Sequence, residues 1–141
     1  MRMTGEHLFV YGTLLVPQIM QQVSGQRHFS LSATLHDYAR YGLLGKTYPG
    51  IVQQQGAGVA GRLYLNVSPA AWRRLDYYED HLYQRQYVQV ETATAGVFHA
   101  WTYVVPDSLR SRLTKRDWSL SQFRQRHLQG FLQHVTSRRH S

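Results

Sequence analysis

Residues 8–15 have the sequence Leu8-Phe9-Val10-Tyr11-Gly12-Thr13-Leu14-Leu15, and the fold can be predicted outward from this stretch. Its first four residues are apolar and favour a β-strand, and the strand pattern stops at Gly12. A helix signal follows at once, because Pro17 suits the first turn of a helix. Such a turn leaves backbone N–H groups unpaired, and they can bind an anion or a developing oxyanion. The alternative is an ordinary glycine turn after a buried strand.

The composition is that of a globular protein. The chain has 141 residues, of which 43% are hydrophobic and 17% charged, so we expect one folded domain and no extensive disorder. The absence of cysteine excludes disulfides and cysteine nucleophiles, and it fits a reducing compartment. The apolar run at residues 8–11 is too short for a signal peptide or a membrane span. We therefore expect a cytoplasmic protein without a membrane partner.

The formal net charge of +8 is concentrated at one end of the chain. Residues 107–141 hold eight Lys and Arg residues and two Asp residues, so this segment alone carries +6. A basic segment of this kind can bind nucleic acid or an acidic partner, although most such faces are only solvated.

Alternating apolar and polar residues predict most of the remaining elements. The alternation favours strands over Phe29–Leu35, Val59–Val67, Gln84–Thr92 and Val97–Val105. Three helices are expected: a short one from Pro17 to about Gly25, one after Ser68-Pro69, and an amphipathic one over Ser119–Val135. Strands outnumber helices and do not alternate with them regularly. The pattern therefore predicts an α+β fold with a small mixed or antiparallel β-barrel and flanking helices.

One glutamate occupies a position where the helical pattern calls for a hydrophobic residue. Trp72, Leu75, Glu79 and Leu82 are spaced so that they share one helix face. A carboxylate on an apolar face is partly desolvated, and Asp76 adds a like charge, so both effects raise its pKa. This is the perturbation that a proton-transfer residue needs. The alternative is a buried structural contact from Glu79 to Arg85 or to a tyrosine hydroxyl.

No metal site or cofactor motif is evident. The eight histidines include no pair at the spacing of metal ligands on a helix. Gly45-Lys46-Thr47 resembles the end of a phosphate-binding loop, but position 40 is Arg where that motif needs Gly. We therefore expect no metal and no cofactor.

Four short motifs together resemble the gamma-glutamylcyclotransferase-like family, in particular its small single-domain type that acts on gamma-glutamylamines. They occur in the family's order between residues 8 and about 105: Phe9-Val10-Tyr11-Gly12-Thr13-Leu14, then Tyr48-Pro49-Gly50-Ile51, then Gly61-Arg62-Leu63-Tyr64, and finally Leu75-Asp76-x-x-Glu79-x-x-x-Tyr83-x-Arg85 followed by Val88 and Val90. Two features depart from the pattern. Asp80 stands where family members often have Gly, and the segment after Pro106 is longer and more basic.

The resemblance implies a function. It implies an enzyme that cyclises a γ-glutamyl group to 5-oxoproline and releases the amine. Glu79 would be the catalytic acid/base, and Tyr11, Gly12, Thr13 and Leu14 would bind the γ-glutamyl substrate, with no metal or cofactor.

We also expect a division of the chain into a barrel core and an added segment. Residues 1–106 would form the core, and residues 107–141 a basic helical extension that packs on it without being required for the chemistry. The competing hypothesis keeps the fold but makes the protein a non-catalytic module whose basic extension binds nucleic acid or an acidic partner. The oligomeric state and the identity of the released amine are open at this point.

Overall fold

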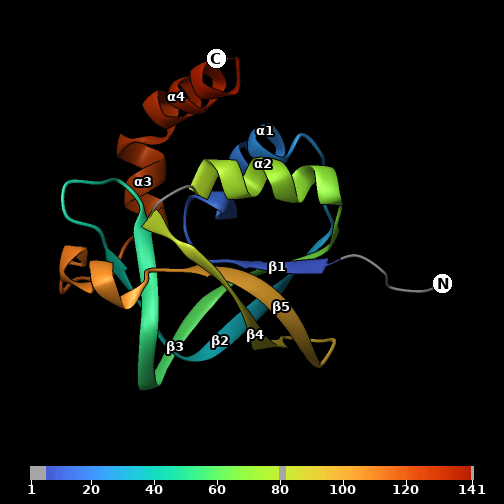
Figure 1. Ribbon diagram of the computed structural model, residues 1–141, viewed down its shortest axis with the longest axis vertical. Helices are drawn as coiled ribbons and strands as arrows, with labels where there is room; N and C mark the ends of the chain where they lie inside the picture. Colours follow the sequence, from blue (N-terminus) through green and yellow to red (C-terminus); the bar gives the residue numbers. More distant parts are fainter. Residues whose placement is uncertain (1–5, 80–81, 141) are drawn as a thin grey trace.

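Two helices lie across one side of a closed five-stranded barrel in the computed structural model (Figure 1). The structure describes residues 6–79 and 82–140, with side chains described as far as Val135. The strands are β1 (Glu6–Val10), β2 (Ser30–Gly42), β3 (Pro49–Val67), β4 (Gln84–Thr92) and β5 (Val97–Val104). The helices are α1 (Pro17–Ser24), α2 (Pro69–Glu79), α3 (Leu120–Arg126) and α4 (Leu128–His140), with short 3-10 turns at Thr13–Leu15 and Asp107–Arg112.

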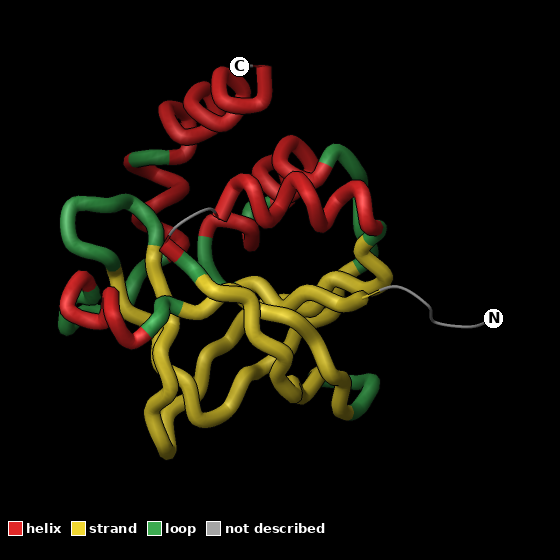
Figure 2. The backbone as a smooth tube through the Cα atoms, viewed as in Figure 1, coloured by secondary structure: helices red, strands yellow, loops and turns green. Residues whose placement is uncertain are grey.

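The barrel is a mixed sheet. Its strand order is β1-β3-β2-β4-β5, and closure comes from β1 pairing parallel with β5, where Leu8 lies opposite Trp101. The remaining strand pairs are antiparallel. Figure 2 shows the closed ring of strands below the helices. The prediction of a small mixed barrel with flanking helices is confirmed.

Strand β1 is apolar on both faces because it lies between two cores. Leu8 and Val10 pack in a cluster with residues of α1 and α2, whereas Phe9 and Tyr11 pack with residues of the other strands inside the barrel. Leu8 is 0% exposed and Phe9 1% exposed. A strand covered on both faces loses the usual alternation, which accounts for the continuous apolar run.

Strands β2 and β3 are longer than their sequence patterns predict. Their pairing continues past Leu35 and Val59, down to Gly42 opposite Pro49. A bulge at Asp37, which has φ +66°, interrupts the register between His36 and Tyr38 and resets the alternation. Residues 53–55 of β3 are three glutamines whose side chains face solvent. This polar run interrupts the apolar alternation, so the sequence pattern does not predict the first half of β3.

The helical predictions also need two corrections. Helix α2 ends at Glu79, so Leu82 is not part of it. The single helix expected over Ser119–Val135 is two helices with a break at His127, whose φ is −128°. The break changes the direction of the chain, and both Phe123 of α3 and Val135 of α4 are buried in the cluster around α1.

Gly61 marks a close approach of β1 to β3. A Cβ atom at this position would lie 2.1 Å from the Val10 carbonyl oxygen and 2.8 Å from the Phe9 ring. We expect Gly61→Ala to lower the free energy of unfolding by about 1–3 kcal/mol, the usual cost of overpacking. Gly58→Ala is the matched control in the same strand, because its Cβ would meet Thr34 at an ordinary 3.8 Å. Denaturant melts that give equal losses for the two variants would contradict the expectation.

Candidate active site

A cavity of about 250 Å³ lies between the end of α2, the turn after β1 and helix α4. Its walls combine apolar residues with several hydroxyls and one carboxylate. The lining residues are Phe9, Val10, Tyr11, Gly12, Thr13, Leu14, Tyr48, Pro49, Tyr78, Glu79, Leu82, Tyr83, Tyr103, Phe131 and His134. All five residues singled out in the sequence, Tyr11, Gly12, Thr13, Leu14 and Glu79, are among them.

The turn after β1 forms one wall and is held in place by its neighbours. The chain leaves the strand at Gly12 and makes one 3-10 turn over Thr13–Leu15. A side chain at Gly12 would collide with the Pro49 ring at 2.9 Å, so glycine is needed here for close packing. The Thr13 hydroxyl is hydrogen-bonded to the Tyr78 hydroxyl at 2.9 Å. These contacts fix the turn with Gly12 and Thr13 facing the cavity.

Glu79 is the carboxylate of the cavity. It is the last residue of α2, where the apolar residues Trp72 and Leu75 of the same helix are buried in the core. Burial, and to a lesser extent the negative charge of Asp76, raise the pKa of Glu79 from 4.5 to about 8. Among the described residues, no hydrogen bond or ion pair reaches its carboxylate. A desolvated carboxyl group with a raised pKa that lines a cavity is typical of a functional site.

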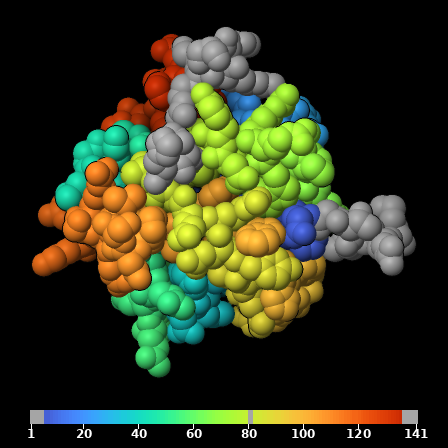
Figure 3. Space-filling model, in the orientation of Figure 1, coloured from blue at the N-terminus to red at the C-terminus, as the bar shows by residue number. Residues whose placement is uncertain are grey.

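Arg85 does not pair with Glu79. Its guanidinium lies 3.6 Å from the Asp76 carboxylate, 4.7 Å from the centre of the Trp72 ring and 5.0 Å from that of Trp101. Asp76 also accepts a hydrogen bond of 2.7 Å from the Tyr103 hydroxyl. Figure 3 shows the side chains of α2 next to those of β4 and β5 on the face where these elements meet. The contact between Glu79 and Arg85, one of the two structural alternatives for this glutamate, is therefore not formed.

Three tyrosines line the cavity together with Glu79. The Tyr11 hydroxyl donates to the Tyr103 carbonyl at 2.6 Å, and the Tyr83 hydroxyl donates to the Pro49 carbonyl at 2.5 Å. Burial raises the pKa of Tyr11, Tyr83 and Tyr103, and the charge of Glu79 raises each further. These phenols therefore remain neutral at physiological pH and act as fixed dipoles.

Several residues of the site were not predicted from the sequence. Tyr78, Phe131 and His134 line the cavity, and Arg40 donates a hydrogen bond of 2.9 Å to the Tyr11 carbonyl. Phe131 and His134 are three residues apart, a spacing that places them on the same face of a helix. Nothing in the local sequence marks Tyr78 or Arg40, because their partners lie 65 and 29 residues away in the chain.

The described residues contain no cluster of three or more His, Asp or Glu side chains suited to a metal ion. In the same part of the chain, no helix has both the length and the apolar character needed to cross a bilayer.

Together these features define a class: an α+β barrel protein with a cavity of small-molecule size, in which a carboxyl group of raised pKa and a strand-to-helix turn share the walls. Residues 8–120 match the family model described as Gamma-glutamyl cyclotransferase, AIG2-like. The chain belongs to this family, as the sequence motifs predicted.

Relatives of the chain are similar over most of its length. AIG2-like protein D of Arabidopsis thaliana is 28% identical over 138 residues, which cover 92% of this chain and 86% of the relative. A second Arabidopsis thaliana protein, known from a solution structure, is 28% identical with a TM-score of 0.71, covering 94% of this chain and 81% of its own. A solved gamma-glutamyl cyclotransferase shares the fold with a TM-score of 0.64 at 20% identity, covering 72% of this chain and 66% of its own.

Proposed function

We propose that this protein is a gamma-glutamyl cyclotransferase that converts a γ-glutamyl amine or amino acid to 5-oxoproline and a free amine. The observation that carries the proposal is the desolvated carboxyl group of Glu79, with a pKa of about 8, in one cavity with the Tyr11–Leu14 turn. Membership of the family supports the same reaction. The proposed location is cytoplasmic.

Glu79 would move the protons that the reaction requires. The substrate's α-amine is mostly an ammonium ion at neutral pH and cannot attack until it loses a proton. The Glu79 carboxylate takes that proton, and the freed amine attacks the γ-carbonyl carbon to form the ring C–N bond. The amide bond to the leaving amine then breaks as Glu79 delivers a proton to the leaving nitrogen, and the ring nitrogen loses its remaining extra proton, which the released amine takes up as an ammonium ion.

The Tyr11–Leu14 turn would bind and position the γ-glutamyl half. Because the attack is intramolecular, holding that half in a folded conformation supplies much of the acceleration. Backbone N–H groups of such a turn can stabilise the carbonyl oxygen as it gains negative charge.

A direct test incubates the protein with a panel of γ-glutamyl amides and measures 5-oxoproline and free amine together. Equal amounts of both products are expected. The N-acetyl derivatives of the same amides are the matched controls, since their blocked α-nitrogen cannot attack and they should release nothing. Release of free glutamate in place of 5-oxoproline would show hydrolysis and would contradict the proposal.

The raised pKa of Glu79 predicts the pH dependence of kcat/KM. The carboxylate form is needed to take the first proton, and in the free protein it becomes dominant only above pH 8 or so. We expect kcat/KM to rise by up to about tenfold per pH unit below that value and to level off above it. A rate profile measured from pH 5.5 to 9 that is flat throughout would exclude Glu79 as the base.

A further inference from the structure

Helix α4 forms part of the cavity wall, although it lies outside the barrel. Phe131 and His134 are on this helix, in the segment after residue 106 that we expected to be dispensable for the chemistry. In Figure 1, α3 and α4 extend from the barrel beside the end of α2, the end that carries Glu79. The cavity is therefore completed by the C-terminal segment.

The wall around Phe131 is aromatic. Its ring meets the rings of Tyr48 and Tyr78 edge-on, with 6.4 Å between centroids in both cases, and the Phe123 ring edge-on at 5.3 Å. Phe123 is only 1% exposed and belongs to the main core. Edge-to-face packing on several sides restricts a ring to one orientation. Phe131 thus presents a fixed apolar surface to the cavity.

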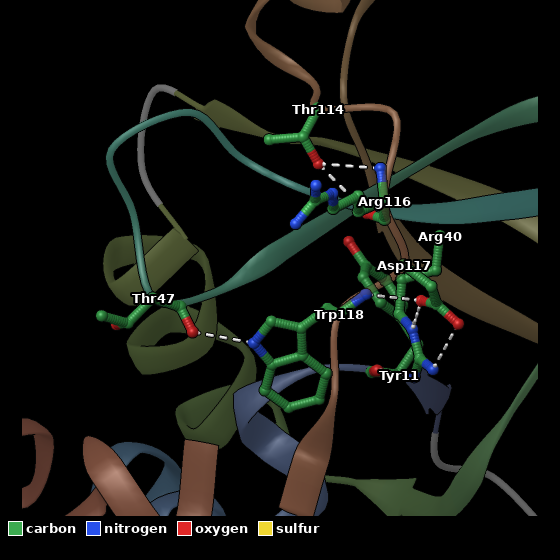
Figure 4. Close-up of polar contacts among 7 residues, drawn as sticks. All are labelled: Tyr11, Arg40, Thr47, Thr114, Arg116, Asp117 and Trp118. Carbon is green, nitrogen blue, oxygen red and sulfur yellow. Dashed lines mark hydrogen bonds and ion pairs between the residues drawn. The ribbon is translucent and has the colours of Figure 1, made fainter. Parts of the chain in front are cut away.

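A set of polar contacts anchors the start of this segment beside the turn after β1. Figure 4 shows Arg40 between Asp117 of this segment and Tyr11 of the turn. The Arg40 guanidinium makes a bidentate ion pair with the Asp117 carboxylate, at 2.7 and 3.2 Å, and it donates a hydrogen bond to the Tyr11 carbonyl. The Trp118 indole N–H donates to the Thr47 carbonyl at 2.8 Å, next to Tyr48 in the chain. The same arginine therefore contacts both the cavity turn and the segment that leads to Phe131.

The cavity lining combines polar groups at Glu79, Gly12 and Thr13 with aromatic rings at Phe131, Tyr48 and Tyr78. The γ-glutamyl half of a substrate carries an ammonium group, a carboxylate and a carbonyl, and the polar groups of the Tyr11–Leu14 turn would hold it next to Glu79. The surface at Phe131, Tyr48 and Tyr78 is left for the other half of the molecule. Aromatic surfaces of this kind favour rings and branched alkyl groups.

We propose that Phe131 is a specificity-determining residue that packs against the leaving amine and favours amines with an aromatic or bulky apolar substituent. This inference rests on the proposed function, since it assumes that the γ-glutamyl half occupies the polar end of the cavity. Phe131 acts in binding and takes no part in proton transfer.

The test measures the binding of two amides that share the γ-glutamyl half. Calorimetry on proteins that carry Glu79→Gln, which is expected to slow turnover strongly, gives Kd for γ-glutamyl phenethylamide and for γ-glutamyl methylamide. Adding Phe131→Ala should raise the Kd of the phenethylamide at least ~10-fold, within the usual range for a lost apolar contact. The methylamide should change by less than ~3-fold. Phe131→Leu keeps an apolar side chain and should give a smaller loss, so it serves if the alanine variant is unstable.

Leu132→Ala is the matched control, because Leu132 is a partly buried neighbour that packs on the core and does not line the cavity. It should leave the ratio of the two Kd values unchanged. Equal weakening of both amides by Phe131→Ala, or no binding of either amide, would overturn the inference. Preferential binding of a γ-glutamyl diaminopentane amide would overturn it too, because the aromatic wall would then select a cation. Binding with the expected preference, combined with no 5-oxoproline from the unmodified protein, would refute the cyclotransferase proposal and leave the role of Phe131 in place.

Discussion

Glu79→Gln is expected to lower kcat for 5-oxoproline release by at least ~10²-fold, the low end of the contribution of a general acid–base group. Gln has nearly the same shape as Glu and keeps its hydrogen-bonding capacity, but it cannot exchange a proton at neutral pH. The binding of a γ-glutamyl amide should change little, since the Tyr11–Leu14 turn would hold the γ-glutamyl half. The measurement is steady-state release of 5-oxoproline at several substrate concentrations, which separates kcat from KM.

Glu91→Gln provides the matched control. Glu91 lies on the outside of β4 with 63% of its side chain exposed, and its partner is His36 at 3.3 Å. Removing this charge should leave kcat and KM unchanged. A Glu79→Gln protein that retains its activity would remove Glu79 from the mechanism. Loss of activity that coincides with loss of the folded state would do the same, so both variants need a thermal melt under assay conditions.

The sequence predicted the parts of the site that depend on local periodicity. The spacing of Trp72, Leu75 and Glu79 placed a carboxylate on the buried face of a helix, and the break at Gly12 placed a turn directly after a buried strand. The helix face follows from the period of 3.6 residues in a helix, and the strand from the period of 2 residues in a strand. Both periods can be read from residues that are close together in the sequence. The order of the strands in the barrel could not be obtained in this way, and the family resemblance implied only a small β-barrel with flanking helices.

The parts of the site that depend on tertiary packing were not predicted. The sequence allows Arg85 to pair with either Asp76 or Glu79. In the structure the Arg85 guanidinium lies over the rings of Trp72 and Trp101, where it pairs with Asp76. The contribution of Phe131 depends on a helix break at His127, and no glycine or proline stands at that position. The two partners of Arg40, Tyr11 and Asp117, are more than 100 residues apart, so no local pattern relates them.

Glu79→Gln should also make the protein more stable than the wild type, by a margin that grows with pH. The pKa of Glu79 is about 8 in the folded protein and near 4.5 when the chain is unfolded. Between these two values the folded protein holds a proton that the unfolded chain has lost, so wild-type stability falls as the pH rises. The glutamine side chain does not ionise, so the free energy of unfolding of the variant should not fall with pH for this reason.

The expected size of the effect follows from the linkage between proton binding and folding. Each pH unit within the window costs the wild type up to about 1.4 kcal/mol, so the two proteins should diverge by up to about 3 kcal/mol between pH 5.5 and 7.5. Glu79 is partly open to the cavity, and water there will reduce the difference. For a chain of this length the gap in Tm should reach roughly 10 °C. Thermal melts of both proteins at four pH values from 5.5 to 8.5 measure it.

The same melts separate a desolvated catalytic carboxylate from a structural one. A carboxylate held in an ion pair has a lowered pKa, and replacing it by Gln would destabilise the protein, by about 3–5 kcal/mol if the pair were buried. An unpaired carboxylate in an apolar wall gives the opposite sign, because its ionisation opposes folding. Glu91→Gln, which alters only an exposed charge, should show no gap that widens with pH. A Glu79→Gln protein that is less stable than the wild type at pH 8.5 would therefore show that Glu79 has a partner in the folded state, and it would remove the physical basis for its raised pKa.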